Sequence, residues 1–225
     1  MPQPDNKKFR IDLHVHCSER SKCAVSTEIE QIETARKRGL NGIAITDHRR
    51  LVPEKRLAEL KREYAPFWVV GGIELGVTDG EEVLVLGIQD PILEEKAWSY
   101  AELHSFVSAR GGYLGVAHPF RYHPGIYLDL DTYRPHGIEV NATSTPDPAR
   151  PIIRSRAARY NIPLLHNSDA HTTKFIGMYH NVFDETPEDE NALLRMLKAG
   201  AFTEGQNDEA RDIYRAAIAK ANVKK

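Results

Sequence analysis

Side chains that bind metals stand at the ends of short apolar runs. Near the N-terminus, the run "DLHVHCS" alternates as a buried strand does, with Asp12, His14 and His16 at every second position. Alternate side chains of a strand share one face, so the pattern predicts these three polar groups on one side and Leu13 and Val15 on the other. Polar groups that converge on a buried face are costly unless something binds them. The run therefore predicts a strand end that holds a ligand.

The same arrangement recurs along the chain. The later members are Asp47 and His48 in "ITDH", Glu74 in "GIEL", His118 in "GVAHP", Glu139 in "GIEVNA", and Asp169 and His171 in "HNSDAH". In α/β barrels the carboxyl ends of the parallel strands open onto one face, which holds the active site. Imidazole with carboxylate and little sulfur suits zinc, manganese or iron. The sequence thus predicts a bowl that binds metal, without choosing among the three.

The other histidines do not follow this pattern as closely. His104, in the middle of a helix, His136, in a turn, and His180, beyond the last site segment, are interpreted as structural. His123 and His166 stand near the site segments but not at the ends of strands, so their role stays open.

Alternating strands and helices must position the site. We expect strands within 9–15, 41–48, 67–75, 113–119, 137–142, 162–171 and 201–204, and helices within 27–39, 53–64, 100–111, 147–160, 192–200 and 208–222. Thr27 with Glu30 forms a capping box, and Asp79-Gly80 between two β-like runs predicts a hairpin. Strands that are apolar on both faces and separated by helices are typical of a parallel α/β protein. We predict a closed or nearly closed barrel.

Composition narrows the class of protein. The chain has 225 residues, 41% of them apolar and 28% charged, with a net charge of −2. This predicts one domain over 1–225, with a short flexible segment at 1–8. Without a basic block, nucleic acid is disfavoured as a partner, and no apolar run is long enough for a membrane helix. The N-terminus lacks the apolar segment of a secretory signal, which predicts a cytoplasmic protein. Two cysteines give no disulfide framework, and no glycine-rich nucleotide-binding motif follows a strand.

Five segments together carry a family resemblance. "DLHVH", "ITDH", "GIE", "AHP" and "SDAH", in this order, resemble the signature segments of the PHP (polymerase and histidinol phosphatase) superfamily, over about 11–177. The resemblance implies a distorted (β/α)7 barrel of the TIM-like type with a cluster of two or three divalent metal ions. It also implies hydrolysis of phosphate esters, so the expected substrate is a small phosphorylated molecule, either a phosphomonoester or a nucleotide-type phosphodiester. A short oligonucleotide is the one nucleic acid substrate left open.

The resemblance also implies roles for individual residues. The first metal would be held by His14, His16, Glu74 and Asp169, with Glu74 bridging to a second metal that His118 also binds. His48 and His171 resemble ligands of a third metal. Asp47 resembles a carboxylate of the active site that orients a ligand. Glu139 and Asn141 match a segment near the site without a clear role as ligands.

Two positions depart from the family pattern. Many members have a His or Asp six to eight residues after the first histidine pair, where this chain offers Cys23 as a candidate ligand; a small buried side chain is the alternative. Members often have a His just before the "LG" of the hairpin, where this chain has Leu84. The number of metals is therefore open.

The predicted reaction is hydrolysis by water that a metal activates. Arg121, three residues after His118, is predicted to grip the phosphate through its planar guanidinium, with Lys174 a weaker candidate. His48 or His171 could protonate the leaving group. The segment that contains Tyr122, and also Tyr127 and Tyr133, is a candidate substrate lid or a packed loop. Two alternatives remain: a hydrolase of the amidohydrolase type, and a barrel without catalytic activity that keeps a metal and serves as a binding module.

Overall fold

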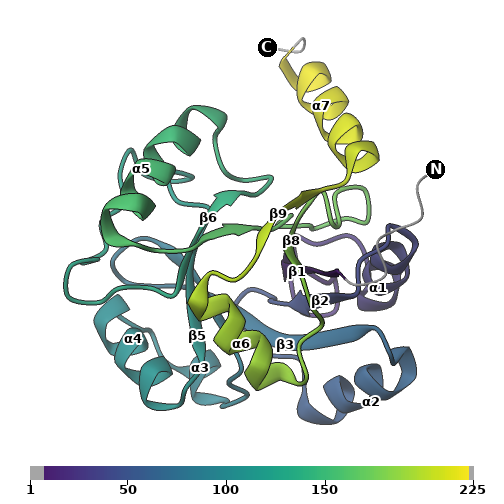
Figure 1. Ribbon diagram of the computed structural model, residues 1–225, viewed down its shortest axis with the longest axis horizontal. Helices are drawn as coiled ribbons and strands as arrows, with labels where there is room; N and C mark the ends of the chain where they lie inside the picture. Colours follow the sequence, from purple (N-terminus) through teal and green to yellow (C-terminus); the bar gives the residue numbers. More distant parts are fainter. Residues whose placement is uncertain (1–7, 223–225) are drawn as a thin grey trace.

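A curled sheet of nine strands forms the centre of the molecule over residues 8–222, the part that this computed structural model describes (Figure 1). Apart from residue 8, the N-terminal segment predicted to be flexible lies outside the described residues. The strands are β1 (Phe9–Val15), β2 (Gly42–Ile45), β3 (Trp68–Gly76), β4 (Glu82–Leu86), β5 (Tyr113–Ala117), β6 (Gly137–Asn141), β7 (Leu164–His166), β8 (Tyr179–Phe183) and β9 (Thr203–Gln206). Their order in the sheet is β7-β6-β5-β4-β3-β2-β1-β8-β9. The predicted α/β barrel of the TIM-like type is confirmed.

Seven helices accompany these strands in the described residues. They are α1 (Glu28–Lys37), α2 (Glu54–Tyr64), α3 (Ile92–Glu95), α4 (Tyr100–Ala109), α5 (Arg150–Tyr160), α6 (Glu190–Ala199) and α7 (Asp208–Asn222). The predicted capping box of Thr27 and Glu30 opens α1. Gly39, with φ of 78°, follows the end of that helix, where glycine is favoured.

The hairpin predicted at Asp79-Gly80 joins β3 to β4, which run antiparallel. β4 also pairs antiparallel with β5, so β3 and β5 run in the same direction. β1, β2, β3, β5, β6 and β7 therefore all point their carboxyl ends toward one mouth of the barrel. The ends of these strands are where the sequence places its candidate ligands.

A bulge in β1 corrects the predicted alternation around the first histidine pair. The pairing with β2 shifts between Asp12 and Val15, so three steps along β1 match two along β2. Leu13 consequently packs in the same cluster as Phe9, whereas Val15 packs in a different one. Asp12 does not share the role of the two histidines. Its carboxylate accepts hydrogen bonds from the backbone N–H groups of His14, Ser168 and Gly177, which ties the loop after β7 to β1.

β8 is a strand that the sequence analysis did not predict, and it helps to close the barrel. Its side chain Asn181 bridges to the end of β7: Oδ1 accepts a hydrogen bond from the backbone N–H of His166, and Nδ2 donates to the carbonyl oxygen of the same residue. An amide side chain thus replaces backbone pairing at this seam. The pattern of β8, "YHNVF", places a polar side chain inside, which conceals the strand from an argument based on apolar runs.

The helices enclose the sheet in three apolar clusters. α1 and α2 pack on β1–β3, and α3, α4 and α5 pack on β3–β6. α6 covers the amino ends of the strands, because Leu193, Leu194 and Leu197 pack against Phe9 and Tyr113, which begin β1 and β5 (Figure 1). The start of α7 packs on Met178 and Tyr179 through Ala210 and Tyr214, and the helix then extends away from the barrel (Figure 1). No helix in the described part of the chain has the length and apolar character needed to cross a membrane.

Candidate metal centre

Imidazoles and carboxylates from six strands gather at the carboxyl-terminal mouth of the barrel. Four groups of three residues each place one donor atom apiece within 4.8 Å of one another; their members are His14, His16, His48, Glu74, Glu82, His118, Asp169 and His171. The structure therefore brings together all seven metal ligands implied by the resemblance, apart from the further candidate Cys23. It adds Glu82, which the sequence analysis missed.

Four buried donor residues have the spacing of a coordination shell. Nε2 of His14 lies 3.0 Å from Nε2 of His16, 3.4 Å from Oε1 of Glu74 and 3.4 Å from Oδ1 of Asp169. Nε2 of His16 lies 3.2 Å from Oδ1 of Asp169 and 3.4 Å from Oε2 of Glu74. Donor atoms about 2.0–2.1 Å from one tetrahedral Zn²⁺ are about 3.3–3.4 Å from each other. The side chains present thus fit a divalent cation.

Glu139, on β6, holds His14 from behind. Its Oε1 accepts a hydrogen bond from Nδ1 of His14 at 2.9 Å and another from Nδ2 of Asn167 at 2.6 Å. Its Oε2 accepts from the backbone N–H of His118 at 2.8 Å. With Nδ1 protonated in this way, the lone pair of His14 is on Nε2, which faces the other donors. Glu139 therefore orients two of the candidate ligands.

A second group consists of three imidazoles. His16, His48 and His171 come from the ends of β1, β2 and β7, and their rings stack, with centroids 4.2 Å apart for both pairs that include His16. Nε2 of His48 lies 3.4 Å from Nε2 of His171, while Nδ1 of His48 lies 2.6 Å from Oε2 of Glu74. His48 thus stands between this group and the carboxylates.

The carboxylates at the centre are held in their ionised form by the imidazoles around them. Burial would raise the pKa of Glu74, but His14 and the hydrogen bonds from nearby imidazoles outweigh it and hold this pKa well below the usual range. The same balance, led by His14, lowers the pKa of Asp169. Oε2 of Glu74 and Oδ1 of Asp169 are buried with imidazole nitrogens of His48 and His16 at 2.6 and 3.2 Å, but neither oxygen makes a hydrogen bond of good geometry with the described residues. Buried ionised oxygens of this kind are stabilised by a cation.

The mouth above the donors is a cavity of about 570 Å³, and Arg121, the residue predicted to bind the phosphate, lines it. It is lined by Cys23, His48, Arg49, Glu74, Gly76, Glu82, Arg121, Tyr122, Ser144 and His171. A guanidinium nitrogen of Arg121 lies 3.4 Å from Nε2 of His118, so its positive charge stands directly at the donor cluster. Lys174 does not line this cavity, and of the three tyrosines in the candidate lid only Tyr122 does.

Asp47 lies behind the cluster and not in it. Its carboxylate accepts hydrogen bonds from the backbone N–H of Cys17, from Oγ of Ser21 and from Nε of Arg20. Oγ of Ser21 lies 3.3 Å from Nδ1 of His16, so Asp47 is positioned to act on that histidine through Ser21. Burial raises the pKa of Asp47, an effect that Arg20 opposes.

The remaining candidates lie outside the donor groups. Cys23 is exposed and lines the mouth without joining any of the four groups found among the described residues. The ring of His123 bonds the carbonyl oxygen of Gly80, and that of His166 bonds the side chain of Asn141. The three histidines interpreted as structural also make local contacts: His104 with Arg134, His136 with Leu114, and His180 with Gly177.

Strained backbone surrounds the mouth. Four residues other than glycine have positive φ there, each just after a strand or in the loop that follows: Arg49, His118, Phe120 and Asp169. Such conformations cost on the order of 1–3 kcal/mol each and persist where the surrounding structure enforces them. Their concentration at one end of the barrel marks that end as the functional one.

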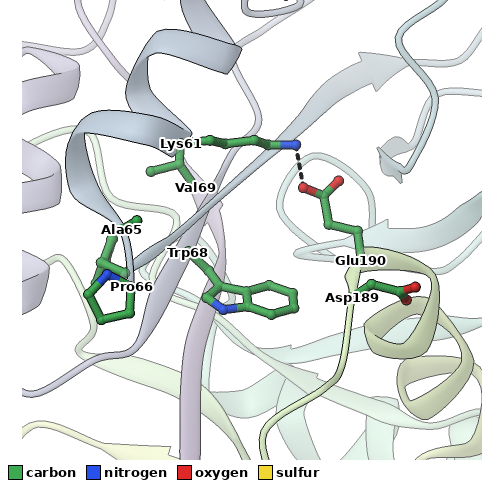
Figure 2. A pocket seen from close by; sticks show the side chains of 8 residues that line it. Lys61, Ala65, Pro66, Trp68, Val69, Asp189 and Glu190 are labelled. Atoms are coloured by element: carbon green, nitrogen blue, oxygen red, sulfur yellow. Dashed lines mark ion pairs between the residues drawn. The ribbon is translucent and has the colours of Figure 1, made fainter.

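A second pocket, at the opposite end, lacks comparable chemistry. It lies where α2 passes into β3 and α6 begins, and Lys61 forms an ion pair there with Glu190 beside the indole of Trp68 (Figure 2). Asp189, also in this pocket, caps α6 by accepting the backbone N–H of Ala192. The charged groups in this pocket are thus already partnered.

Comparison with known proteins gives one family match and several similar folds. The model of a PHP-associated family matches residues 149–202. PsfC from Pseudomonas syringae has a TM-score of 0.68 at 19% identity, covering 97% of this chain and 100% of the other. A two-domain protein from Bacteroides vulgatus, described as containing a predicted PHP-like metal-dependent phosphoesterase, has a TM-score of 0.67 at 14% identity, covering 96% and 72%. The C-terminal part of the chain thus matches a PHP-associated family model, and the whole chain has a PHP-type fold.

One further solved structure with a similar fold is an endonuclease. The lesion-specific endonuclease PfuEndoQ from Pyrococcus furiosus has a TM-score of 0.63 at 19% identity, covering 88% of this chain and 57% of the other. No curated protein sequence matches this chain. The chain thus combines a PHP-type fold with a donor set suited to divalent cations.

Proposed function

We propose that this protein is a metal-dependent phosphoesterase of the PHP superfamily that hydrolyses a small phosphorylated substrate. The observation that carries the proposal is the shell of donors around His14 and His16, 3.0–3.4 Å apart, with the Arg121 guanidinium at the same mouth. Bound cations would supply Lewis acidity, which activates water and neutralises charge on phosphate oxygens. Two or three ions of zinc, manganese or iron suit these side chains.

The side chains of the mouth divide the remaining tasks. Arg121 presents a planar fork that matches two phosphate oxygens, and its side chain is 29% exposed, so a substrate can reach it. His48 and His171 are also partly exposed, at 29% and 23%, and either of them could protonate a leaving group if it is not committed to a metal. Glu139 and Asp47 hold histidines in position and do not face the substrate.

The test is hydrolysis by protein that has been freed of metal and reloaded. We expect turnover of p-nitrophenyl phosphate or bis(p-nitrophenyl) phosphate with Mn²⁺, Zn²⁺ or Fe²⁺, and none after chelation. A 5′-phosphorylated oligonucleotide tests the nucleic acid substrate that remains open. Folded protein that cleaves no phosphate ester with any of these metals would contradict the proposal. Turnover of an amide or lactone instead would support the amidohydrolase alternative, and one tightly bound ion without turnover would support the binding module.

A further inference from the structure

Glu82 faces the metal centre close to the position where the family places a histidine. β4 runs antiparallel to β3, with Leu84 opposite Glu74 and Glu82 opposite Gly76. Since alternate residues of a strand share a face, Glu82 lies on the same face as Leu84, one step nearer the mouth. Leu84 is buried and offers no donor atom. The carboxylate two residues earlier takes its place beside the cluster.

The carboxylate of Glu82 is aimed at two other donors. Its Oε2 lies 3.6 Å from Nε2 of His118, which itself lies 2.8 Å from Oε1 of Glu74. One oxygen of Glu82 also falls within 4.8 Å of donor atoms of Glu74 and His48. Oε2 of Glu82 is buried and has no hydrogen-bond partner among the described residues. A buried carboxylate oxygen without a hydrogen-bond partner is stabilised by a nearby positive charge.

A positive charge already lies close to these donors. One guanidinium nitrogen of Arg121 is 3.6 Å from Oε2 of Glu82 and 3.4 Å from Nε2 of His118. Both distances exceed an ordinary hydrogen bond, so the guanidinium balances the charge without being firmly bound. A cation held by Glu82 and His118 would repel Arg121 and leave its fork free for a phosphate.

We propose that Glu82 is a metal ligand, and that with Glu74 and His118 it forms an oxygen-rich site that prefers Mn²⁺. Carboxylate ligands favour manganese and magnesium, whereas imidazoles favour zinc, iron and nickel. The group of His16, His48 and His171 offers only nitrogen and is the natural zinc or iron site beside it. The presence of Glu82 thus divides the candidate ligands into an oxygen-rich half and a nitrogen-only half. This inference rests on the metal dependence proposed above.

Metal uptake by wild type and two variants tests the assignment. Protein freed of metal is titrated with Mn²⁺, free Mn²⁺ being counted by electron paramagnetic resonance, and Zn²⁺ content is measured separately by elemental analysis. We expect Glu82→Gln to weaken one Mn²⁺ site at least about tenfold and to leave zinc binding to the three histidines unchanged. We expect Glu82→His to restore that site with its preference shifted toward Zn²⁺.

Glu81→Gln is the matched control. Glu81 carries the same charge one residue away, and its carboxylate accepts the backbone N–H of Tyr127 instead of facing the centre. We expect this variant to bind Mn²⁺ as wild type does, with circular dichroism confirming that all variants fold. If Glu82→Gln binds as many Mn²⁺ ions as wild type, with the same affinity, then Glu82 is not a ligand, and the proposed function is unaffected. A wild-type protein that takes up no divalent cation would instead overturn the proposed function.

Discussion

Two buried clusters of charge lie side by side near the ends of β1 and β2, and only one of them is prepared for a ligand. In the first, which we call the arginine network (Arg20, Asp47, Glu28 and Arg56), each carboxylate oxygen accepts a hydrogen bond: Asp47 from Arg20 and from Ser21, and Glu28 from Arg20 and from Arg56. In the second, the candidate metal centre, one oxygen each of Glu74, Glu82 and Asp169 makes no hydrogen bond of good geometry with any residue among 8–222.

The comparison teaches how to separate structural from functional charge. A buried ion pair whose oxygens are all bonded has offset its own desolvation and needs nothing more. A buried carboxylate oxygen that makes no hydrogen bond of good geometry keeps a lone pair free, which a cation can bind. The two clusters meet at Ser21, whose Oγ donates to Asp47 and lies 3.3 Å from Nδ1 of His16. Removing a charge from the metal centre should therefore impair metal binding and catalysis, whereas removing a charge from the arginine network should lower the stability of the fold.

The largest effect is expected from Asp169→Asn. Asparagine tolerates the positive φ of this position, 53°, so the fold should be retained. The variant loses an ionised donor that lies 3.2–3.4 Å from both histidines of β1, and we expect kcat to fall on the order of 10²–10³-fold because cations and transition state are held less well. Phosphate ester hydrolysis with saturating metal measures this. A kcat within threefold of wild type would contradict the role given to Asp169.

The counterpart in the arginine network is Glu28→Gln. This change leaves Arg20 and Arg56, with side chains 11% and 31% exposed, without their shared carboxylate. We expect the free energy of unfolding, measured with urea, to drop by about 2–3 kcal/mol, since one member of a largely buried pair is lost. Metal content should stay at the wild-type value. If Glu28→Gln lost metal but kept its stability, the arginine network would serve metal binding and not the stability of the fold.

A smaller effect on the centre is expected from Glu139→Gln. Glu139 is not among the candidate metal ligands. Its carboxylate accepts hydrogen bonds from Nδ1 of His14 and from the backbone N–H of His118. A glutamine can accept only one of these two bonds, so one ligand loses its orientation. We expect metal affinity to fall about 10–100-fold, as measured by isothermal titration calorimetry. Equal affinity in the variant would show that His14 does not depend on Glu139.

The smallest effect is expected from Arg121→Lys. Lysine keeps the charge but lacks the fork that matches two phosphate oxygens. We expect KM for a phosphomonoester to rise about tenfold with a lesser change in kcat, about 1.4 kcal/mol of lost binding. Lys174→Ala is the control, because Lys174 lies outside the mouth cavity. If the control raised KM as much as the variant did, the phosphate site would have been placed wrongly.

Local patterns sufficed to predict most of the fold. The capping box of Thr27 and Glu30 and the Asp79-Gly80 turn depend on residues close together in sequence, and both appear as predicted. The grouping of His14, His16, Glu74 and Asp169 was also foreseeable, because carboxyl ends of parallel strands share one mouth. Glu82 could have been found by a different local argument: it precedes Leu84 by two residues in the strand after the predicted hairpin, and alternate residues of a strand share a face.

The sequence by itself determined which residues could bind metal and which elements would carry them, because periodicity and capping act over a few residues. Only the tertiary structure decided where each side chain finally points. The bulge in β1 turns Asp12 to the loop after β7, and the amide of Asn181 closes the barrel at β7. The contact of Asp12 with the loop joins residues more than a hundred positions apart, and the contact of Asn181 with β7 joins residues about fifteen positions apart. Such contacts depend on the register of paired strands, which no local pattern encodes.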